Sequence, residues 1–245
     1  MRNVDRAEQF RDALLTALTA VADPDRAAGQ QAYMRSEMPF HGVTVPDVRK
    51  IVRGIVARDP IPDATVWQAV VLALWRQAGH REERYGAIDV LNHPRHRAWL
   101  TPGRIDLIEE LVVTGAWWDF VDAVASHGAG AMLANHPAET AAILRCWAVD
   151  SDIWKRRTAI LAQLRRKAAI DRQLLVDVIE PSIGETEFFL RKAIGWALRE
   201  VSRTDPDFVV EFVTENADRL SPLSKREALK ILLRRGVIRD IPGNN

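Results

Sequence analysis

Short amphipathic segments separated by helix-breaking residues recur along the whole chain, and this rhythm constrains the fold more than any other feature. Apolar residues repeat within the segments at the spacing of a helix face, which predicts helices. The breaks are made by Pro, Gly, Asn or Asp, with Asp-Pro pairs at 23–24, 59–60 and 205–206. No alternating apolar run flanked by hairpin turns occurs. The sequence therefore predicts an all-α protein.

The expected helices follow one another as pairs. They lie before Asp23, at 27–34, from Pro46 to Asp59, at 66–78, at 82–91, from Pro102 to Val112, around Trp118, and at 138–147, 153–164, 174–179, 185–201, 206–213 and 224–234. The pairs recur every 35–45 residues or so, roughly the length of a two-helix solenoid repeat. No linker rich in Gly, Ser or Pro interrupts the chain, so residues 1–245 are predicted to form a single domain with a loose tail from Gly236.

Composition excludes several classes of protein. Hydrophobic residues make up 47% and charged residues 27%, as in a soluble globular domain. No apolar run is long enough to span a membrane, and the N-terminus does not resemble a secretory signal. The single cysteine, Cys146, cannot form a disulfide within the chain and is expected to be a small buried residue. A cytoplasmic protein without a membrane partner is expected.

The stretch from Gly115 to Asp122 combines two tryptophans and two carboxylates in an otherwise apolar segment. If it is helical, Trp118 and Asp122 are four residues apart and lie on one face. The neighbouring face, expected to be core, carries Trp117, Val121 and Val124. An indole beside a carboxylate is a site for a cation, or for a group that becomes cationic as it reacts.

Two later helices carry residues that their apolar stripes do not require. Arg157 falls on such a stripe, so it needs an anionic partner, either a carboxylate of the protein or a phosphate of a ligand. Trp196 has Lys192 four residues before it and Arg199 three residues after it, so one face presents an indole between two cations. Gly195, in the middle of the same helix, is expected to allow close approach by another backbone.

Basic residues cluster although the formal net charge is only +1. The clusters are Lys155, Arg156, Arg157 and 165–167; Arg191, Lys192, Arg199 and Arg203; and Lys225, Arg226, Lys230, Arg234 and Arg235. Acidic residues gather elsewhere, so a near-neutral protein can carry a basic groove. Aromatic residues interleaved with cations are typical of nucleic-acid-binding surfaces.

Structural roles compete with each of these interpretations. Tryptophan in a helical repeat usually packs between helices, and five are expected in the core: Trp67, Trp75, Trp99, Trp147 and Trp154. Asp122 and Arg157 can also form a purely structural buried ion pair. His93 and His96 share a turn without a third ligand and the other histidines are scattered along the sequence, so no metal site is expected.

Four motifs stand in a fixed order along the chain. They are Tyr33–Arg35 with Phe40–Gly42, Trp117–Asp122, Arg156–Ile160, and Phe188–Phe189 running into Ala193–Glu200. Together they resemble the AlkD-type DNA alkylation repair glycosylases, over about residues 27–234. The resemblance implies a right-handed α-solenoid of HEAT-like antiparallel helix pairs with a concave DNA-binding face.

The resemblance also implies an activity and residue roles. Members of the family excise cationic alkylated purines, chiefly N3-alkyladenine and N7-alkylguanine, from duplex DNA without a metal or organic cofactor and without flipping the base. The catalytic carboxylate matches Asp122, and two active-site tryptophans match Trp118 and Trp196. Arg157 matches the arginine that holds the DNA backbone beside the lesion, and Tyr33 matches a tyrosine that contacts DNA. The basic clusters add four expected DNA contacts: Lys155, Arg156, Lys192 and Arg199.

One departure from the family pattern is visible. Thr44-Val45 precedes Pro46 where the family often has Gln-Thr, which puts the contact to the strand opposite the lesion in question. No lysine in the motifs is placed for Schiff-base chemistry, so a monofunctional glycosylase is expected. A groove that must admit duplex DNA suggests a monomer. Two alternatives remain open: a non-catalytic protein that binds unusual DNA structures, and a helical scaffold for protein partners.

Overall fold

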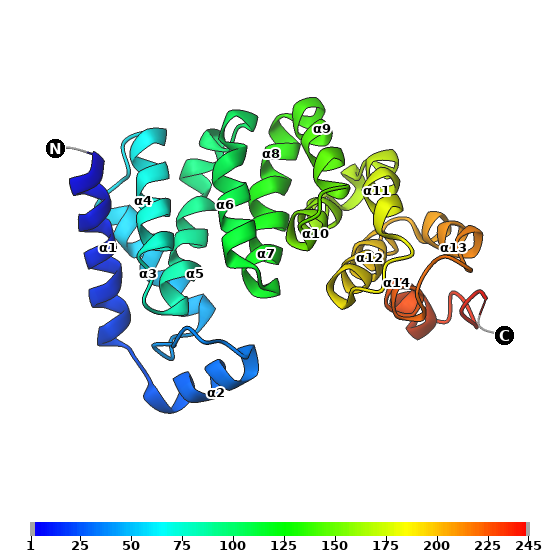
Figure 1. Ribbon diagram of the computed structural model, residues 1–245, viewed down its shortest axis with the longest axis horizontal. Coiled ribbons are helices and arrows are strands. Elements are labelled where there is room, and N and C mark those ends of the chain that lie inside the picture. The colour runs from blue at the N-terminus through cyan, green and yellow to red at the C-terminus, as the bar shows by residue number, and fades with distance from the viewer. Residues whose placement is uncertain (1–2, 244–245) are drawn as a thin grey trace. The chain divides into compact units, whose positions relative to one another are not determined.

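The computed structural model describes residues 3–243 (Figure 1). Every regular element in this part of the chain is a helix, so the predicted all-α fold is confirmed. The chain divides into two compact units, one ending at Leu100 and the other beginning at Thr101, and each is described by itself. The assignment of the whole chain to a single domain stays a prediction. Among the described residues, no helix has the length and apolar character needed to cross a bilayer.

The first unit packs its helices around an apolar core. Its elements are α1 (Asn3–Ala20), α2 (Pro24–Met34), α3 (Val45–Arg58), α4 (Ala64–Arg76), α5 (Arg81–Leu91) and the short η1 (Pro94–Trp99). Helix α1 contacts α3, α4 and α5, and this packing buries Leu14, Leu18 and Trp67 completely. Helix α2 lies at the edge of these four helices (Figure 1) and buries Met34 at its last position.

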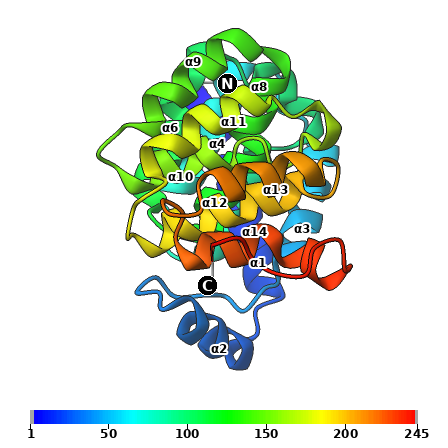
Figure 2. The same cartoon turned by 90° about the vertical axis from the view of Figure 1, so that its right-hand side faces the viewer.

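The second unit is organised around α10 (Ile153–Leu161). Its other elements are η2 (Pro102–Arg104), α6 (Ile105–Gly115), α7 (Trp118–Ala123), η3 (Val124–Ala129), α8 (Gly130–Asn135), α9 (Pro137–Ala148), η4 (Lys167–Ala169), α11 (Arg172–Ile179), η5 (Glu180–Ser182), α12 (Phe188–Val201), α13 (Pro206–Glu215) and α14 (Pro222–Arg234). Helix α10 contacts α6, α7, α9, α11 and α12. Helices α12 and α14 run side by side (Figure 2).

The Asp-Pro pairs act mostly as helix starts. The side chains of Asp23 and Asp205 accept hydrogen bonds from the backbone N–H groups of Arg26 and Phe208, and the following proline opens the helix. An aspartate cap accepts a hydrogen bond from an N–H group that has no partner within the helix. Proline has no backbone N–H, and in the first turn this costs no hydrogen bond. The third pair differs because Asp59 instead ends α3.

Gly195 makes the close approach that the sequence predicts. A β-carbon at this position would lie 2.6 Å from Cβ of Glu227 and 2.9 Å from the carbonyl oxygen of Ser224. Both residues belong to α14, so the absence of a side chain lets α12 and α14 pack backbone against backbone.

The prediction that Cys146 is buried is wrong, because its side chain is exposed. Helix α9 turns Leu144, Trp147 and Ala148 toward the core, and Cys146 falls on the other side of the helix. Of the five tryptophans expected in the core, four are buried and Trp99 is half-buried. In the expected loose tail, the ammonium group of Lys225 donates to the carbonyl of Gly243, and residues 244 and 245 lie outside the described residues.

Candidate active site

Helix α7 presents its carboxylate and indole as the sequence predicts. The left-handed backbone of Ala116, with φ of 39°, ends α6, and Trp117 precedes the first turn of α7. Phe120 and the neighbouring Val121 are fully buried and anchor the helix. Trp118 and Asp122 are both half-buried. One short helix therefore carries a partly accessible indole and, one turn later, a partly accessible carboxylate.

Arg157 of α10 is the partner of Asp122. Its Nε donates to Oδ1 of Asp122 at 2.7 Å and its Nη2 donates to Oδ2 at 2.9 Å. The third nitrogen, Nη1, donates to the backbone carbonyl of Phe189 at the start of α12. Arg157 is only 4% exposed, so the prediction that this arginine needs an anion is confirmed, and the anion is a carboxylate of the protein. The two hydrogen bonds to Asp122 link α10 to α7, and the hydrogen bond to the carbonyl of Phe189 links α10 to α12.

The pKa of Asp122 lies above the ordinary value for aspartate. Burial is the largest cause, because it penalises the charged form, and the nearby Asp119 carboxylate adds to the shift. The hydrogen bonds and positive charge of Arg157 act in the opposite direction. Arg157 therefore opposes the protonation of Asp122 that burial favours.

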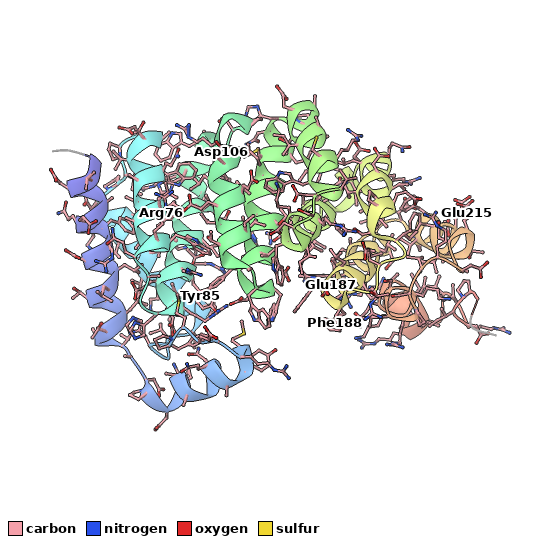
Figure 3. All side chains as sticks on the ribbon, viewed as in Figure 1. Arg76, Tyr85, Asp106, Glu187, Phe188 and Glu215 are labelled. Atoms are coloured by element: carbon pink, nitrogen blue, oxygen red, sulfur yellow. The ribbon has the colours of Figure 1, made fainter. Side chains whose placement is uncertain are left out.

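An aromatic cluster lies beside the arginine at the start of α12. The ring of Phe189 lies 5.5 Å from that of Trp117 and 4.9 Å from that of Trp154, measured between centroids. The guanidinium carbon of Arg157 is 5.9 Å from the centroid of Phe189. The neighbouring Phe188 is 50% exposed; Figure 3 marks it beside Glu187 at the start of α12. Phe189 thus contributes both its ring and its carbonyl to the surroundings of Arg157.

Trp196 lies two helical turns after Phe189 on α12. Seven residues is close to two full turns, so the two side chains project from nearly the same face of α12. Trp196 is half-buried, as is Trp118, whereas Trp67, Trp75, Trp147 and Trp154 are buried. The two tryptophans predicted to act at the site are thus among those that keep part of their surface accessible.

A π-helix and a closely packed glycine follow the helix that carries Asp122. The π-helix η3 directly follows α7, and the hydroxyl of Ser126 donates to the carbonyl of Asp122 at 2.7 Å. π-Helical turns widen a helix locally and are frequent at functional sites. The next residue after η3 is Gly130, where a β-carbon would lie 2.6 Å from the carbonyl oxygen of Ala162, just beyond α10. Gly130 thus allows α8 to pack closely against the end of α10.

We expect Gly130→Ala to lower the free energy of unfolding by about 1–3 kcal/mol, the usual cost of overpacking against a backbone that cannot move freely. The change pushes α8 away from the end of α10. Gly29→Ala is the matched control, because that glycine is helical and a β-carbon added there would meet no atom within 4 Å. Alanine at this position should stabilise by up to about 1 kcal/mol. Denaturant unfolding of both variants measures the difference; equal stabilities would contradict the packing role.

Comparison with known proteins identifies the family. The family of DNA alkylation repair enzymes matches residues 14–232. The chain belongs to this family. A solved structure described as a predicted DNA alkylation repair enzyme from Enterococcus faecalis is similar with a TM-score of 0.77 and 31% identity, covering 86% of this chain and 96% of that chain. The Pseudomonas fluorescens alkylpurine DNA glycosylase AlkC, bound to DNA containing an abasic site analog, is similar with a TM-score of 0.48 and 15% identity, covering 95% and 64% respectively. A search of curated proteins finds no match.

The basic residues expected to contact DNA in this DNA alkylation repair protein are held in ion pairs of its second unit. Lys155 pairs with Glu109 at 2.8 Å and with Asp150 at 2.6 Å. Lys192 and Arg199 both pair with Glu227. Arg156 donates to the hydroxyl of Ser182 and to the carboxylate of Glu185. Tyr33, in the first unit, is 77% exposed. Their contacts with DNA stay predictions.

Sequence reasoning missed the role of Glu82, a fully buried residue of α5. Its carboxylate accepts three backbone N–H groups, from His41 at 2.9 Å, Gly42 at 2.8 Å and Val43 at 3.0 Å. Three such bonds compensate the burial of one negative charge. They fix the loop of the family motif between α2 and α3. Acidic residues are common in the first turn of a helix, so no local signal could have indicated this contact.

Proposed function

We propose that the chain is a monofunctional DNA glycosylase that hydrolyses the N-glycosidic bond of cationic alkylated purines in duplex DNA. N3-alkyladenine and N7-alkylguanine are the proposed lesions. The observation that carries the proposal is the Asp122 carboxylate, held at both oxygens by a buried arginine and standing on the helix that also carries Trp118. Membership of the DNA alkylation repair family supports the same class of substrate.

The chemistry needs only one carboxylate because the substrate is already activated. Alkylation at N3 or N7 makes the purine cationic and therefore a good leaving group, so no acid is required to protonate it. As the glycosidic bond breaks, positive charge develops on the deoxyribose, as in glycoside hydrolysis. Asp122 stabilises that charge and orients the attacking water. Arg157 donates one hydrogen bond to each carboxylate oxygen, which leaves further lone pairs for the water.

Two indole faces add to the stabilisation. Trp118 and Trp196 attract the cationic sugar through cation–π interactions worth about 0.5–2 kcal/mol each, depending on how dry the site is. Their half-buried state supports this role, since a fully buried indole could not meet a ligand. The base stays in the duplex in this proposal, and the enzyme works from the backbone side.

Arg157 holds the catalytic carboxylate and the DNA backbone at once. Three of its five N–H donors engage Asp122 and Phe189. The other two are proposed to meet the phosphate beside the lesion. Tyr33, Lys155, Arg156, Lys192 and Arg199 are proposed as further contacts of a monomeric enzyme to duplex DNA, and no cofactor is needed.

Incubation with duplex DNA carrying N7-methylguanine tests the proposal. We expect free N7-methylguanine and an intact strand with an abasic site, and no release of guanine from the unmodified duplex. Chromatography detects the free base, and heating in alkali converts the abasic site to a strand break. DNA binding without release would instead favour a non-catalytic protein that binds DNA structures, and neither binding nor release would favour a protein scaffold.

A further inference from the structure

Two histidines that are far apart in the sequence meet in the first unit. The rings of His41 and His80 stack with centroids 3.8 Å apart and an angle of 19° between their planes. Glu83, in the first turn of α5, joins them: its Oε1 lies 3.8 Å from Nε2 of His41 and 3.4 Å from Nδ1 of His80. Histidines that are scattered along the sequence are therefore neighbours in the fold.

The three side chains differ in access to solvent. The side chains of His41 and Glu83 are 8% and 3% exposed, whereas that of His80 is 36% exposed. Nε2 of His41 is buried and makes no hydrogen bond, although buried polar nitrogens nearly always find a partner. The cluster thus consists of two buried side chains, one of which has a ring nitrogen without a hydrogen bond, and the half-exposed side chain of His80.

The backbone around the cluster is already fixed. Glu82 accepts the N–H of His41, and the carbonyl of His41 accepts the N–H of Asp23 at 2.8 Å. The Glu83 carboxylate is oriented by the backbone N–H groups of His80 and Gly79, at 2.9 and 3.2 Å. Supporting contacts of this kind preset the direction of metal ligands.

We propose that His41, His80 and Glu83 bind a zinc ion that fastens the α2–α3 loop to the start of α5. Two imidazole nitrogens and one carboxylate oxygen are a ligand set that zinc prefers over magnesium or calcium, which favour oxygen alone. All candidate ligand atoms lie within 4.8 Å of one another. Ligand atoms on a tetrahedral zinc ion with bonds of about 2.1 Å lie about 3.4 Å apart. Binding therefore requires the half-exposed His80 ring to turn out of the stack and the ligand atoms to approach one another by roughly an ångström.

Imidazole binds a metal through the lone pair of a ring nitrogen, and a carboxylate binds it through an oxygen. On α5, the side chain of Arg81 donates to Ser36 and lies over Phe40. Glu83 supplies the carboxylate of the ligand set.

Calorimetric titration of the tag-free protein with Zn²⁺ tests the site, with Co²⁺ as a spectroscopic probe of the ligands. Wild type and the control His136→Gln, which changes a histidine of the other unit, are expected to bind one equivalent tightly and to give the visible absorption of Co²⁺ held by imidazole. His41→Gln and Glu83→Gln are expected to lose that equivalent. Should His41→Gln fail to fold by circular dichroism, His80→Gln replaces it, because that side chain is half-exposed.

Zinc should also slow hydrogen exchange at the amides of residues 36–44 in wild type but not in Glu83→Gln. No saturable zinc binding by the wild type, or binding that survives both substitutions in folded protein, would overturn the proposal and leave the histidines as a packed pair. Base release has no part in these measurements, so the zinc site and the glycosylase proposal stand or fall independently.

Discussion

Asp122→Asn is expected to lower the rate of N7-methylguanine release by about 10²–10⁴-fold while leaving affinity for the same duplex nearly unchanged. Asparagine keeps the shape of the side chain but carries no negative charge, so the cationic sugar of the transition state loses its counter-charge and the water loses its acceptor. Single-turnover assays with excess protein isolate the chemical step, and fluorescence anisotropy of a labelled duplex measures binding.

Asp119→Asn is the matched control for this substitution. Asp119 lies on the same short helix and is also half-buried, and the change in charge and shape is identical. We expect its rate of release to stay near that of the wild type. Because Arg157 loses its anionic partner in Asp122→Asn, thermal unfolding must show that the variant is folded at the assay temperature. If the folded Asp122→Asn variant releases N7-methylguanine at the wild-type rate, Asp122 has no part in the mechanism.

Arg157→Met is expected to lower the free energy of unfolding by about 3–5 kcal/mol, the usual cost of removing one partner of a buried ion pair. It should also move the acid limb of the pH–rate profile to higher pH. Burial raises the pKa of Asp122 and Arg157 opposes the rise, so without the guanidinium the pKa rises further and less of the carboxylate is ionised at neutral pH. Activity should therefore recover in part as the pH is raised.

The stability of the same variant should depend on pH in a defined direction. A carboxylate whose pKa is higher in the folded than in the unfolded protein opposes folding once it ionises. The deficit of Arg157→Met relative to wild type should therefore be largest above the raised pKa of Asp122 and should narrow as the pH falls through it. Denaturant unfolding over a series of pH values measures this.

Arg156→Met is the control that distinguishes loss of the Asp122–Arg157 ion pair from loss of any positive charge on α10. Arg156 precedes Arg157 on α10, but the side chain of its partner Glu185 is 40% exposed, and pairs at the surface contribute about 1 kcal/mol or less. We expect a smaller loss of stability and an unchanged acid limb. If the acid limb moves equally in both variants, the pKa of Asp122 is set by the nearby positive charge in general and not by the two hydrogen bonds from Arg157.

Helix-capping patterns and helical spacing predicted most of the helices. They also predicted that Trp118 and Asp122 lie on one face and that Arg157 has an anionic partner. Asp23 and Asp205 start helices because an aspartate before a proline can satisfy the first turn of the helix that follows. Trp118 and Asp122 share a face because helical spacing fixes it. Arg157 needed an anion because it lies in an apolar stripe, and Asp122 was one of the carboxylates that the sequence offered as its partner.

The remaining features depend on contacts that no local pattern contains. Nothing near His41 in the sequence indicates that it meets a distant ring, that of His80. The π-helix η3 follows α7 without a break, and nothing in the sequence Val124–Ala129 distinguishes it from an α-helical segment. The prediction for Cys146 failed because its neighbours Arg145 and Trp147 leave the direction of the helix face ambiguous, and the packing of α9 decided it.

The three bonds that Glu82 makes have a consequence for how the protein can evolve. Its carboxylate accepts main-chain N–H groups of residues 41–43, groups that every amino acid except proline provides. The shape of the loop is therefore set through one residue of α5 rather than through hydrogen bonds of the loop's own side chains. A substitution of Glu82 would release the loop, whereas changes within the loop are limited by the burial of Phe40 and Val43 and by Gly42, whose φ is 85° and where a β-carbon would lie 1.9 Å from the carbonyl oxygen of Asp23.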